Sequence, residues 1–220
     1  MSNVDLLILK RICQILVIGI SFYKWNRLGL FLRLISVQVF VSLVIDMLAW
    51  TAIYKLGWKN NFTIYNVYMP IEAGLLLGAA WRYVTPARER RLLLMSAALF
   101  GLCWLFCIVR HFQQLANYAL VCENMLLIGW YLYVLYYAVI ADGIHTCNAV
   151  LWVCIGIVFY AGCMVPYVSL TQYLLRDYPA INTKLFIIVS VCEKLRYVFT
   201  GIALLVSRPQ LKPRHLSTNG

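Results

Sequence analysis

Seven apolar stretches, joined by short polar connections, constrain the fold of this chain most strongly. A transmembrane α-helix needs about 20 largely apolar residues to cross the hydrocarbon core of a bilayer. The stretches run Val4–Tyr23, Leu32–Tyr54, Ile64–Val84, Arg91–Val109, Leu115–Ile140, Cys147–Leu170 and Lys184–Val206. We therefore predict an all-α bundle of seven transmembrane helices in residues 1–207, followed by a basic disordered tail in residues 208–220.

The composition agrees with a polytopic membrane protein. The 220 residues are 63% hydrophobic and 12% charged, whereas about a quarter of the residues of soluble domains are charged. The net charge of +11 lies in loops and in the tail, so we expect the lipid bilayer, and not nucleic acid, to be the partner of these basic residues. The eight cysteines form no C-x-x-C pair. We accordingly expect no metal site and no cofactor.

The distribution of basic residues predicts an orientation. The loops after the first, third and fifth stretches, together with the tail, carry ten Lys and Arg residues, and the other side carries five. Counting Lys10 and Arg11 with the N-terminus narrows the ratio to ten against seven. Because basic residues accumulate in cytoplasmic loops, the N-terminus is expected outside and the C-terminus in the cytoplasm.

Ionisable residues inside the apolar stretches are the second strong feature. The acidic ones are Asp46, Glu72, Glu123 and Glu193, and the basic ones are Lys10, Arg11, Lys194 and Arg196. With a rise of about 1.5 Å per helical residue, the acids and Lys10 fall in one layer in the outer half of the membrane. A charge at this depth costs several kcal/mol unless it is paired. We therefore expect the two signs to neutralise each other inside the bundle.

Polar residues at helical spacing extend this layer into stripes that face the bundle interior. We predict a polar ligand pocket lined by Asp46, Glu72, Glu123, Glu193, Lys194 and Arg196, with Lys10, Gln14, Asn66, Tyr68, Asn117, Asn124 and Tyr197 as further candidates. Two alternatives stay open. The ion pairs serve only to fix helix register, or a shifted first span places Lys10 and Arg11 at the membrane surface.

The third and fifth stretches share the pattern Asn-x5-Glu-x2-Leu-Leu-x-Gly, which begins at Asn66 and at Asn117. Such an echo is typical of the internal repeats of transporters, although chance similarity in a Leu-rich chain is the alternative. The segment NVYMPIE, Asn66 to Glu72, resembles uncharacterised bacterial seven-helix integral membrane proteins with an Asn-x-Tyr-x-x-x-Glu start to the third helix. The segment VLWVCIGIVFYAGC is similar to their sixth helix. The resemblance implies a small protein of the bacterial inner membrane and supplies no activity.

The leading functional prediction is a sensor or transporter that binds or moves a small polar or amphipathic molecule. A sensor would signal through the loop TPARERR and the basic tail to a cytoplasmic protein partner. A membrane-embedded hydrolase with paired carboxylates is the runner-up, and a structural membrane partner is the third class. Zinc hydrolases with several buried histidines are rejected, because His111, His145 and His215 all fall at loops or in the tail.

Overall fold

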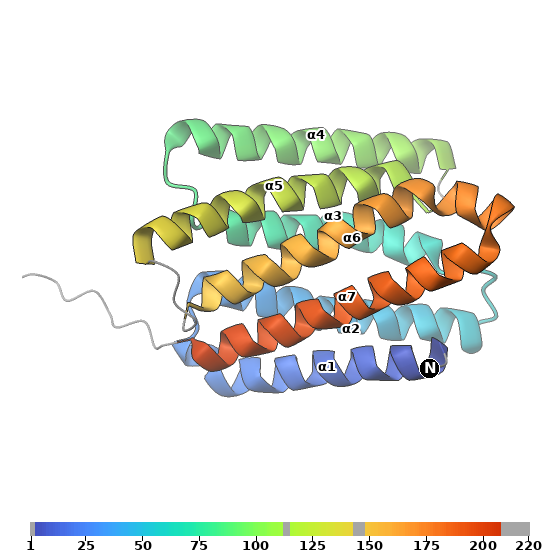
Figure 1. Ribbon diagram of the computed structural model, residues 1–220, viewed down its shortest axis with the longest axis horizontal. Coiled ribbons are helices and arrows are strands. Elements are labelled where there is room, and N and C mark those ends of the chain that lie inside the picture. The colour runs from blue at the N-terminus through green and yellow to red at the C-terminus, as the bar shows by residue number, and fades with distance from the viewer. Residues whose placement is uncertain (1–2, 112–114, 143–147, 208–220) are drawn as a thin grey trace, which may run out of the picture.

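The computed structural model describes residues 3–111, 115–142 and 148–207, which form a bundle of antiparallel α-helices (Figure 1). The helices are α1 (Asn3–Lys24), α2 (Leu30–Tyr54), α3 (Phe62–Trp81), α4 (Ala87–His111), α5 (Asn117–Asp142), α6 (Ala149–Asp177) and α7 (Pro179–Val206). Within these ranges no strand is present, and a single 3-10 turn, Trp25–Arg27, joins α1 to α2. The all-α prediction is confirmed, whereas the predicted disordered tail lies outside the described residues.

Local signals explain where the helices begin. The side chain of Asn148 accepts a hydrogen bond from the backbone N–H of Val150 at 3.0 Å and caps α6. Pro179 occupies the first turn of α7, where its missing N–H leaves no bond unmade. Both α6 and α7 extend beyond the apolar stretches seen in the sequence, because hydropathy marks the part that fits the membrane and not the full helix.

Six helices form a closed ring, and α4 packs outside it. The neighbours around the ring are α1 and α2, α2 and α3, α3 and α5, α5 and α6, α6 and α7, and α7 and α1. Helix α4 packs against α3 and α5 and lies at the edge of the bundle (Figure 1). In this ring α1 stands opposite α5, and α3 stands opposite α7.

One half of the ring is filled by a hydrophobic core. Its members include Val39, Leu76, Tyr131, Ile157 and Leu204, which are 0–2% exposed. These residues lie on the side of the polar layer that faces the connections from α1 to α2 and from α3 to α4. The core therefore closes the bundle at that end.

Four helices of the described part are long and apolar enough to cross a membrane, and this supports an integral membrane protein. Their candidate spans are Leu30–Tyr54, Ala87–Arg110, Asn117–Ala138 and Ala149–Thr171. On α4, the apolar side chains of Leu94, Met95 and Leu102 are 57–68% exposed, as expected for a surface that faces lipid. Helices α1, α3 and α7 fall outside this set. The polar layer lowers their hydropathy, with Lys10 on α1, Glu72 on α3 and Arg196 on α7.

Candidate functional site

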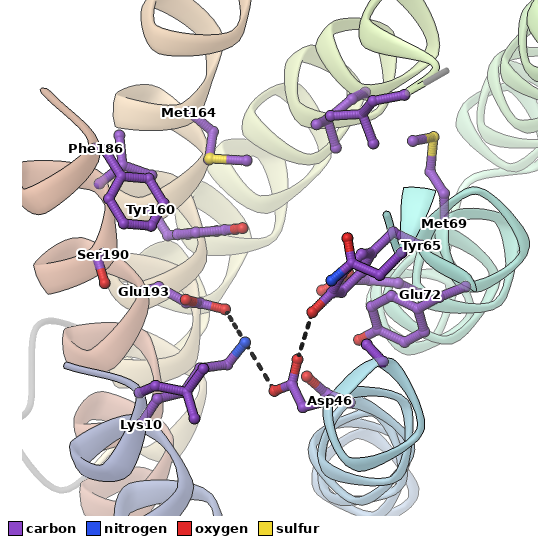
Figure 2. A pocket seen from close by; sticks show the side chains of 18 of the residues that line it. Lys10, Asp46, Tyr65, Met69, Glu72, Tyr160, Met164, Phe186, Ser190 and Glu193 are labelled. Carbon is purple, nitrogen blue, oxygen red and sulfur yellow. Dashed lines mark hydrogen bonds and ion pairs between the residues drawn. The ribbon is translucent and has the colours of Figure 1, made fainter. Parts of the chain in front are cut away.

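Lys10 joins acidic residues from two other helices. Its Nζ lies 2.8 Å from Oδ2 of Asp46 on α2 and 2.7 Å from Oε1 of Glu193 on α7 (Figure 2). The hydroxyl of Tyr65 on α3 donates to Oδ1 of Asp46 at 3.1 Å. The side chains of Lys10, Asp46 and Glu193 are 16%, 10% and 22% exposed. This group of side chains, which we call the Lys10 cluster, ties α1, α2, α3 and α7 together at one level.

Arg196 is a buried cation, and Glu72 neutralises it. Nη1 of Arg196 lies 2.9 Å from Oε1 of Glu72, which also accepts a hydrogen bond from Nε2 of Gln38 at 2.8 Å. The guanidinium carbon of Arg196 lies 4.5 Å from the ring centroid of Tyr160 on α6. A charge-assisted hydrogen bond and an aromatic face both favour a guanidinium group. They explain how Arg196 is tolerated at 4% exposure.

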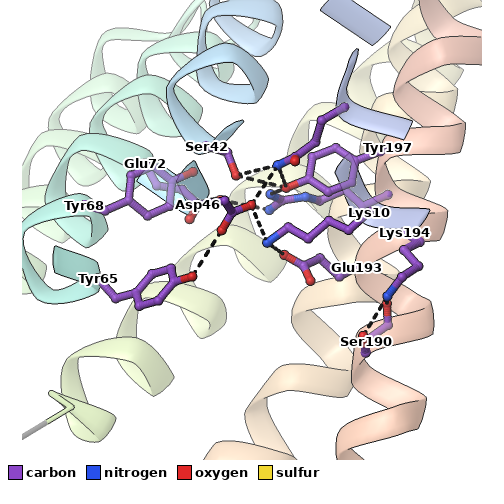
Figure 3. Close-up of polar contacts among 12 residues, drawn as sticks. Lys10, Ser42, Asp46, Tyr65, Tyr68, Glu72, Ser190, Glu193, Lys194 and Tyr197 are labelled. Carbon is purple, nitrogen blue, oxygen red and sulfur yellow. Dashed lines mark hydrogen bonds and ion pairs between the residues drawn. The ribbon is translucent and has the colours of Figure 1, made fainter. Parts of the chain in front are cut away.

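Hydroxyl and amide groups connect the Lys10 cluster with Arg196. The amide nitrogen of Gln14 lies 3.1 Å from Oγ of Ser42, 3.2 Å from Oδ2 of Asp46 and 3.2 Å from the hydroxyl of Tyr197 (Figure 3). The hydroxyls of Ser42 and Tyr197 are themselves 3.1 Å apart. Gln14 and Tyr197 are fully buried. The Lys10 cluster and the Arg196–Glu72 pair thus belong to one polar network across the ring. This network separates the hydrophobic core from the end of the bundle that carries the N-terminus.

A cavity of about 610 Å³ extends from this network toward the end of the bundle that carries the N-terminus. Charged side chains of the network form its floor (Figure 2). Its walls carry large apolar and aromatic side chains, namely Trp50, Tyr54, Phe62, Met164, Tyr167 and Phe186. The described lining residues come from the six ring helices and from the chain next to them, and none comes from α4. The cavity is one-sided, because the hydrophobic core fills the opposite half of the ring.

The charges that line the cavity are not all engaged within the protein. Lys194 donates to the backbone oxygen of Ser190 at 2.8 Å and to its Oγ at 2.7 Å. Glu123 is 3% exposed, and its Oε1 is buried without a hydrogen-bond partner in the described structure. Nε and Nη2 of Arg11 are likewise buried and without a partner there. One acid and one base therefore line the cavity with unused hydrogen-bonding capacity.

The structure brings most of the predicted site residues together. The cavity lining contains Lys10, Asp46, Tyr68, Glu72, Glu123, Glu193, Lys194 and Arg196. Gln14 and Tyr197 belong to the polar network below.

The three asparagines have other surroundings. Oδ1 of Asn66 accepts from the backbone N–H of Ala116 at 3.1 Å and positions the start of α5. Nδ2 of Asn124 donates to the backbone oxygen of Leu120 on its own helix. Asn117 is the first residue of α5, and it is not part of the cavity lining. The matching positions of the sequence echo therefore differ in environment: Glu72 is ion-paired, and Glu123 is not.

Several polar or aromatic residues of the site were not among the sequence candidates; they include Gln38, Ser42, Tyr65, Tyr160 and Ser190. Gln38 and Ser190 lie four residues, or close to one helical turn, from a polar residue of the layer, and this spacing was the available signal. Tyr160 lies among apolar residues of α6. Its role depends on the approach of Arg196 from α7, which no local pattern contains.

Comparison with family models, with curated proteins and with solved structures finds no match for this chain. In the described residues, no group of three or more His, Cys, Asp or Glu side chains is placed to hold a metal ion.

Proposed function

We propose that this chain is a seven-span integral membrane protein that senses a small amphipathic molecule, which it binds in the cavity above the polar network. The observation that supports this function is the combination of a charged floor with apolar and aromatic walls in one cavity of about 610 Å³. Pockets of about 300 to 1,000 Å³ with mainly apolar walls and a few polar groups are typical of small-molecule sites.

The ring supports seven spans. Helices α1, α3 and α7 have 22, 20 and 28 residues, enough to cross a bilayer. In the ring, α3 lies between α2 and α5, and α1 and α7 lie side by side between α2 and α6. The three flanking helices, α2, α5 and α6, are apolar enough to span. The charged residues of α1, α3 and α7 meet inside the ring, where the lipid does not reach them. With the orientation predicted from the basic residues, the cavity opens to the outside, and the resemblance noted above suggests the bacterial inner membrane.

The closed half of the ring favours a sensor over a transporter. Transport requires the site to open alternately to both sides, and here the core around Leu76, Tyr131 and Leu204 would have to separate. A sensor needs only a change in how the helices pack around the ligand. The connection from α3 to α4, together with Arg88 and Arg90 in the first turn of α4, would pass this change to a cytoplasmic protein.

The first test is binding of a small-molecule library to the purified chain in lipid nanodiscs, followed by thermal unfolding. A ligand that binds only the folded state at a concentration of about 100 Kd adds about 2.7 kcal/mol of stability. Met164→Trp places a larger side chain in the cavity and should abolish the stabilisation by the ligand. Met95→Trp makes the same change on the lipid-facing surface of α4, where Met95 is 68% exposed, and should preserve it.

A second measurement separates the functional classes. The bound ligand should not be carried across proteoliposome membranes and should be recovered chemically unchanged. Flux that Met164→Trp blocks would identify a transporter, and cleavage of the ligand would identify the hydrolase with paired carboxylates. If no member of a broad library stabilises the protein, the proposal of a ligand-binding cavity is wrong.

A further inference from the structure

We propose that the ligand of this cavity is a zwitterion with an apolar substituent, whose cationic group faces Glu123 and whose anionic group faces Arg11. This inference rests on the proposed function, because it specifies the chemistry of the molecule that the cavity takes. Its basis is a pair of ionisable side chains of opposite sign that line one cavity from opposite helices of the ring. Each has at least one buried polar atom without a hydrogen-bond partner in the described residues.

Glu123 provides the negative end. The cation that could neutralise it, Arg196, is already held by Glu72 and stacked on Tyr160. A carboxylate buried to this degree without a donor is costly. Glu123 therefore presents a carboxyl group to the cavity, to which a protonated amine of the ligand would donate a hydrogen bond and which a quaternary amine would contact by charge alone.

Arg11 provides the positive end. Its guanidinium carbon lies 5.8 Å from the ring centroid of Trp50. Trp50 follows Asp46 on α2 by one helical turn, toward the open end of the cavity. Nε and Nη2 are both unpartnered among the described residues, and a guanidinium edge of this kind binds a carboxylate or phosphate with two parallel hydrogen bonds. The neighbouring Lys10 cannot serve in its place, because Asp46 and Glu193 already hold its ammonium group.

The charge balance favours a ligand without net charge. Four acidic and four basic residues line the cavity, so its formal charges cancel. A ligand that is only an anion or only a cation would add an uncompensated charge to a site of low polarity. A zwitterion adds none and satisfies both Glu123 and Arg11. Because α1 and α5 stand opposite each other in the ring, such a ligand would span the cavity, with its apolar part against the aromatic walls.

The test compares three soluble probes with the same hexyl chain: N-hexyl-N,N-dimethylglycine, hexyltrimethylammonium and heptanoate. Binding is measured by titration calorimetry on the full chain in phosphatidylglycerol nanodiscs. The glycine betaine should bind at least about tenfold more tightly than either singly charged probe. Glu123→Gln and Arg11→Gln should each weaken betaine binding by about tenfold to a hundredfold, as expected for the loss of one ionic contact with the ligand. Glu123→Gln should leave heptanoate binding unchanged, and Arg11→Gln should leave hexyltrimethylammonium binding unchanged.

Lipid is the second source of the same chemistry, since phosphatidylethanolamine carries an ammonium and a phosphate. Nanodiscs that contain this lipid distinguish the sources: loss of betaine binding in them identifies a lipid headgroup as the occupant, and unchanged binding identifies a free molecule. Asp177→Asn, outside the cavity, is the control variant, and thermal unfolding checks that each variant is folded.

Two results would overturn the inference. One is equal affinity for the betaine and for a singly charged probe, and the other is betaine binding that survives both substitutions. If none of the three probes binds while a library compound binds in a manner sensitive to Met164→Trp, the zwitterion is wrong and the cavity function stands. If nothing binds at all, the proposed function itself fails.

Discussion

Arg196 and Glu72 lie 124 residues apart in the sequence, yet Nη1 of Arg196 and Oε1 of Glu72 are 2.9 Å apart in the ring. Their contact spans the bundle from α7 to α3, which stand on opposite sides. Together with the Lys10 cluster it explains how a long apolar helix carries Glu193 and Arg196 near its middle. Each of these two charges has its counter-charge on another helix.

Removing Glu72 should destabilise the protein strongly. Glu72→Leu leaves Arg196 buried without a counter-ion, and the loss of one partner from a buried pair costs about 3 to 5 kcal/mol. The double variant Glu72→Leu with Arg196→Met removes both charges and should recover much of this loss. Unfolding in mixed micelles measures the difference. Asp177→Asn disrupts the surface pair with Arg176, which is 80% exposed, and should change stability by less than about 1 kcal/mol. Equal effects of Glu72→Leu and Asp177→Asn would contradict the prediction.

Lys10 should be more critical than either of its acidic partners. Lys10→Met removes the only cation paired with Asp46 and Glu193 in the described structure and leaves both carboxylates buried. We expect a larger loss of unfolding free energy than for Asp46→Asn or Glu193→Gln alone. Adding both acid substitutions to Lys10→Met should restore stability. A triple variant as unstable as Lys10→Met would show that Lys10 stabilises the fold by packing and not by charge.

Gly156 should tolerate no side chain larger than a methyl group. A Cβ at this position would lie 3.1 Å from Cβ of Phe199 and 3.4 Å from the backbone of Arg196, so Gly156→Val forces α6 and α7 apart. Overpacking of this kind costs about 1 to 3 kcal/mol. Gly162→Ala on the same helix is the control, because a Cβ there meets no atom within 4 Å. Thermal unfolding of the two variants should differ clearly, and equal stability would contradict the close approach of α6 and α7.

Cys163 and Cys192 should form a disulfide under mild oxidation. Their sulfur atoms lie 3.4 Å apart across the contact of α6 with α7, and a bond requires about 2.05 Å. With copper phenanthroline as the oxidant, mass spectrometry should detect a disulfide-linked pair of peptides that contains Cys163 and Cys192. Cys154 is buried on the same helix and should stay reduced. Linkage of Cys154 in preference to this pair would contradict the arrangement of α6 and α7.

If the chain has seven spans, the two ends of α1 lie on opposite sides of the membrane, and the same holds for the two ends of α3 and of α7. Protease sites introduced at Trp58 and at Thr85, which flank α3, should be cut from opposite faces of sealed vesicles. The same result is expected for Asn3 and Arg27 around α1, and for Tyr178 and Ser207 around α7. Cleavage of both members of a pair from one face would remove that helix from the set of spans.

The helices and the depth of the polar layer could be predicted from the sequence, because both depend on local spacing. Apolar windows placed all seven helices and missed chiefly the last part of α6 and the first turn of α7, and the helical rise placed Lys10, Asp46 and Glu193 at one level. The pairing of the charges could not be predicted, because it depends on the order of the helices around the ring. The exclusion of α4 brings α3 next to α5, and no local pattern in either helix reports this.

The asparagines are residues that the sequence predicted for the site and that the structure places elsewhere. A polar side chain in an apolar helix has two ways to satisfy its hydrogen bonds: it faces a site, or it binds backbone. Asn66 and Asn124 take the second way, and their sequence context is similar to that of Glu72 and Glu123. Only the position of the neighbouring helix distinguishes the two outcomes.

Because α4 lies outside the ring, the cavity and its charges are assembled without it. Replacing the exposed apolar side chains of α4 with other apolar side chains would change only the contacts of the protein with lipid. Fluorophores or affinity tags attached along that surface would report on the protein in a membrane while leaving the cavity untouched. The outer surface of α4 is therefore available for contact with lipid or with another membrane protein without any change to the residues that line the cavity.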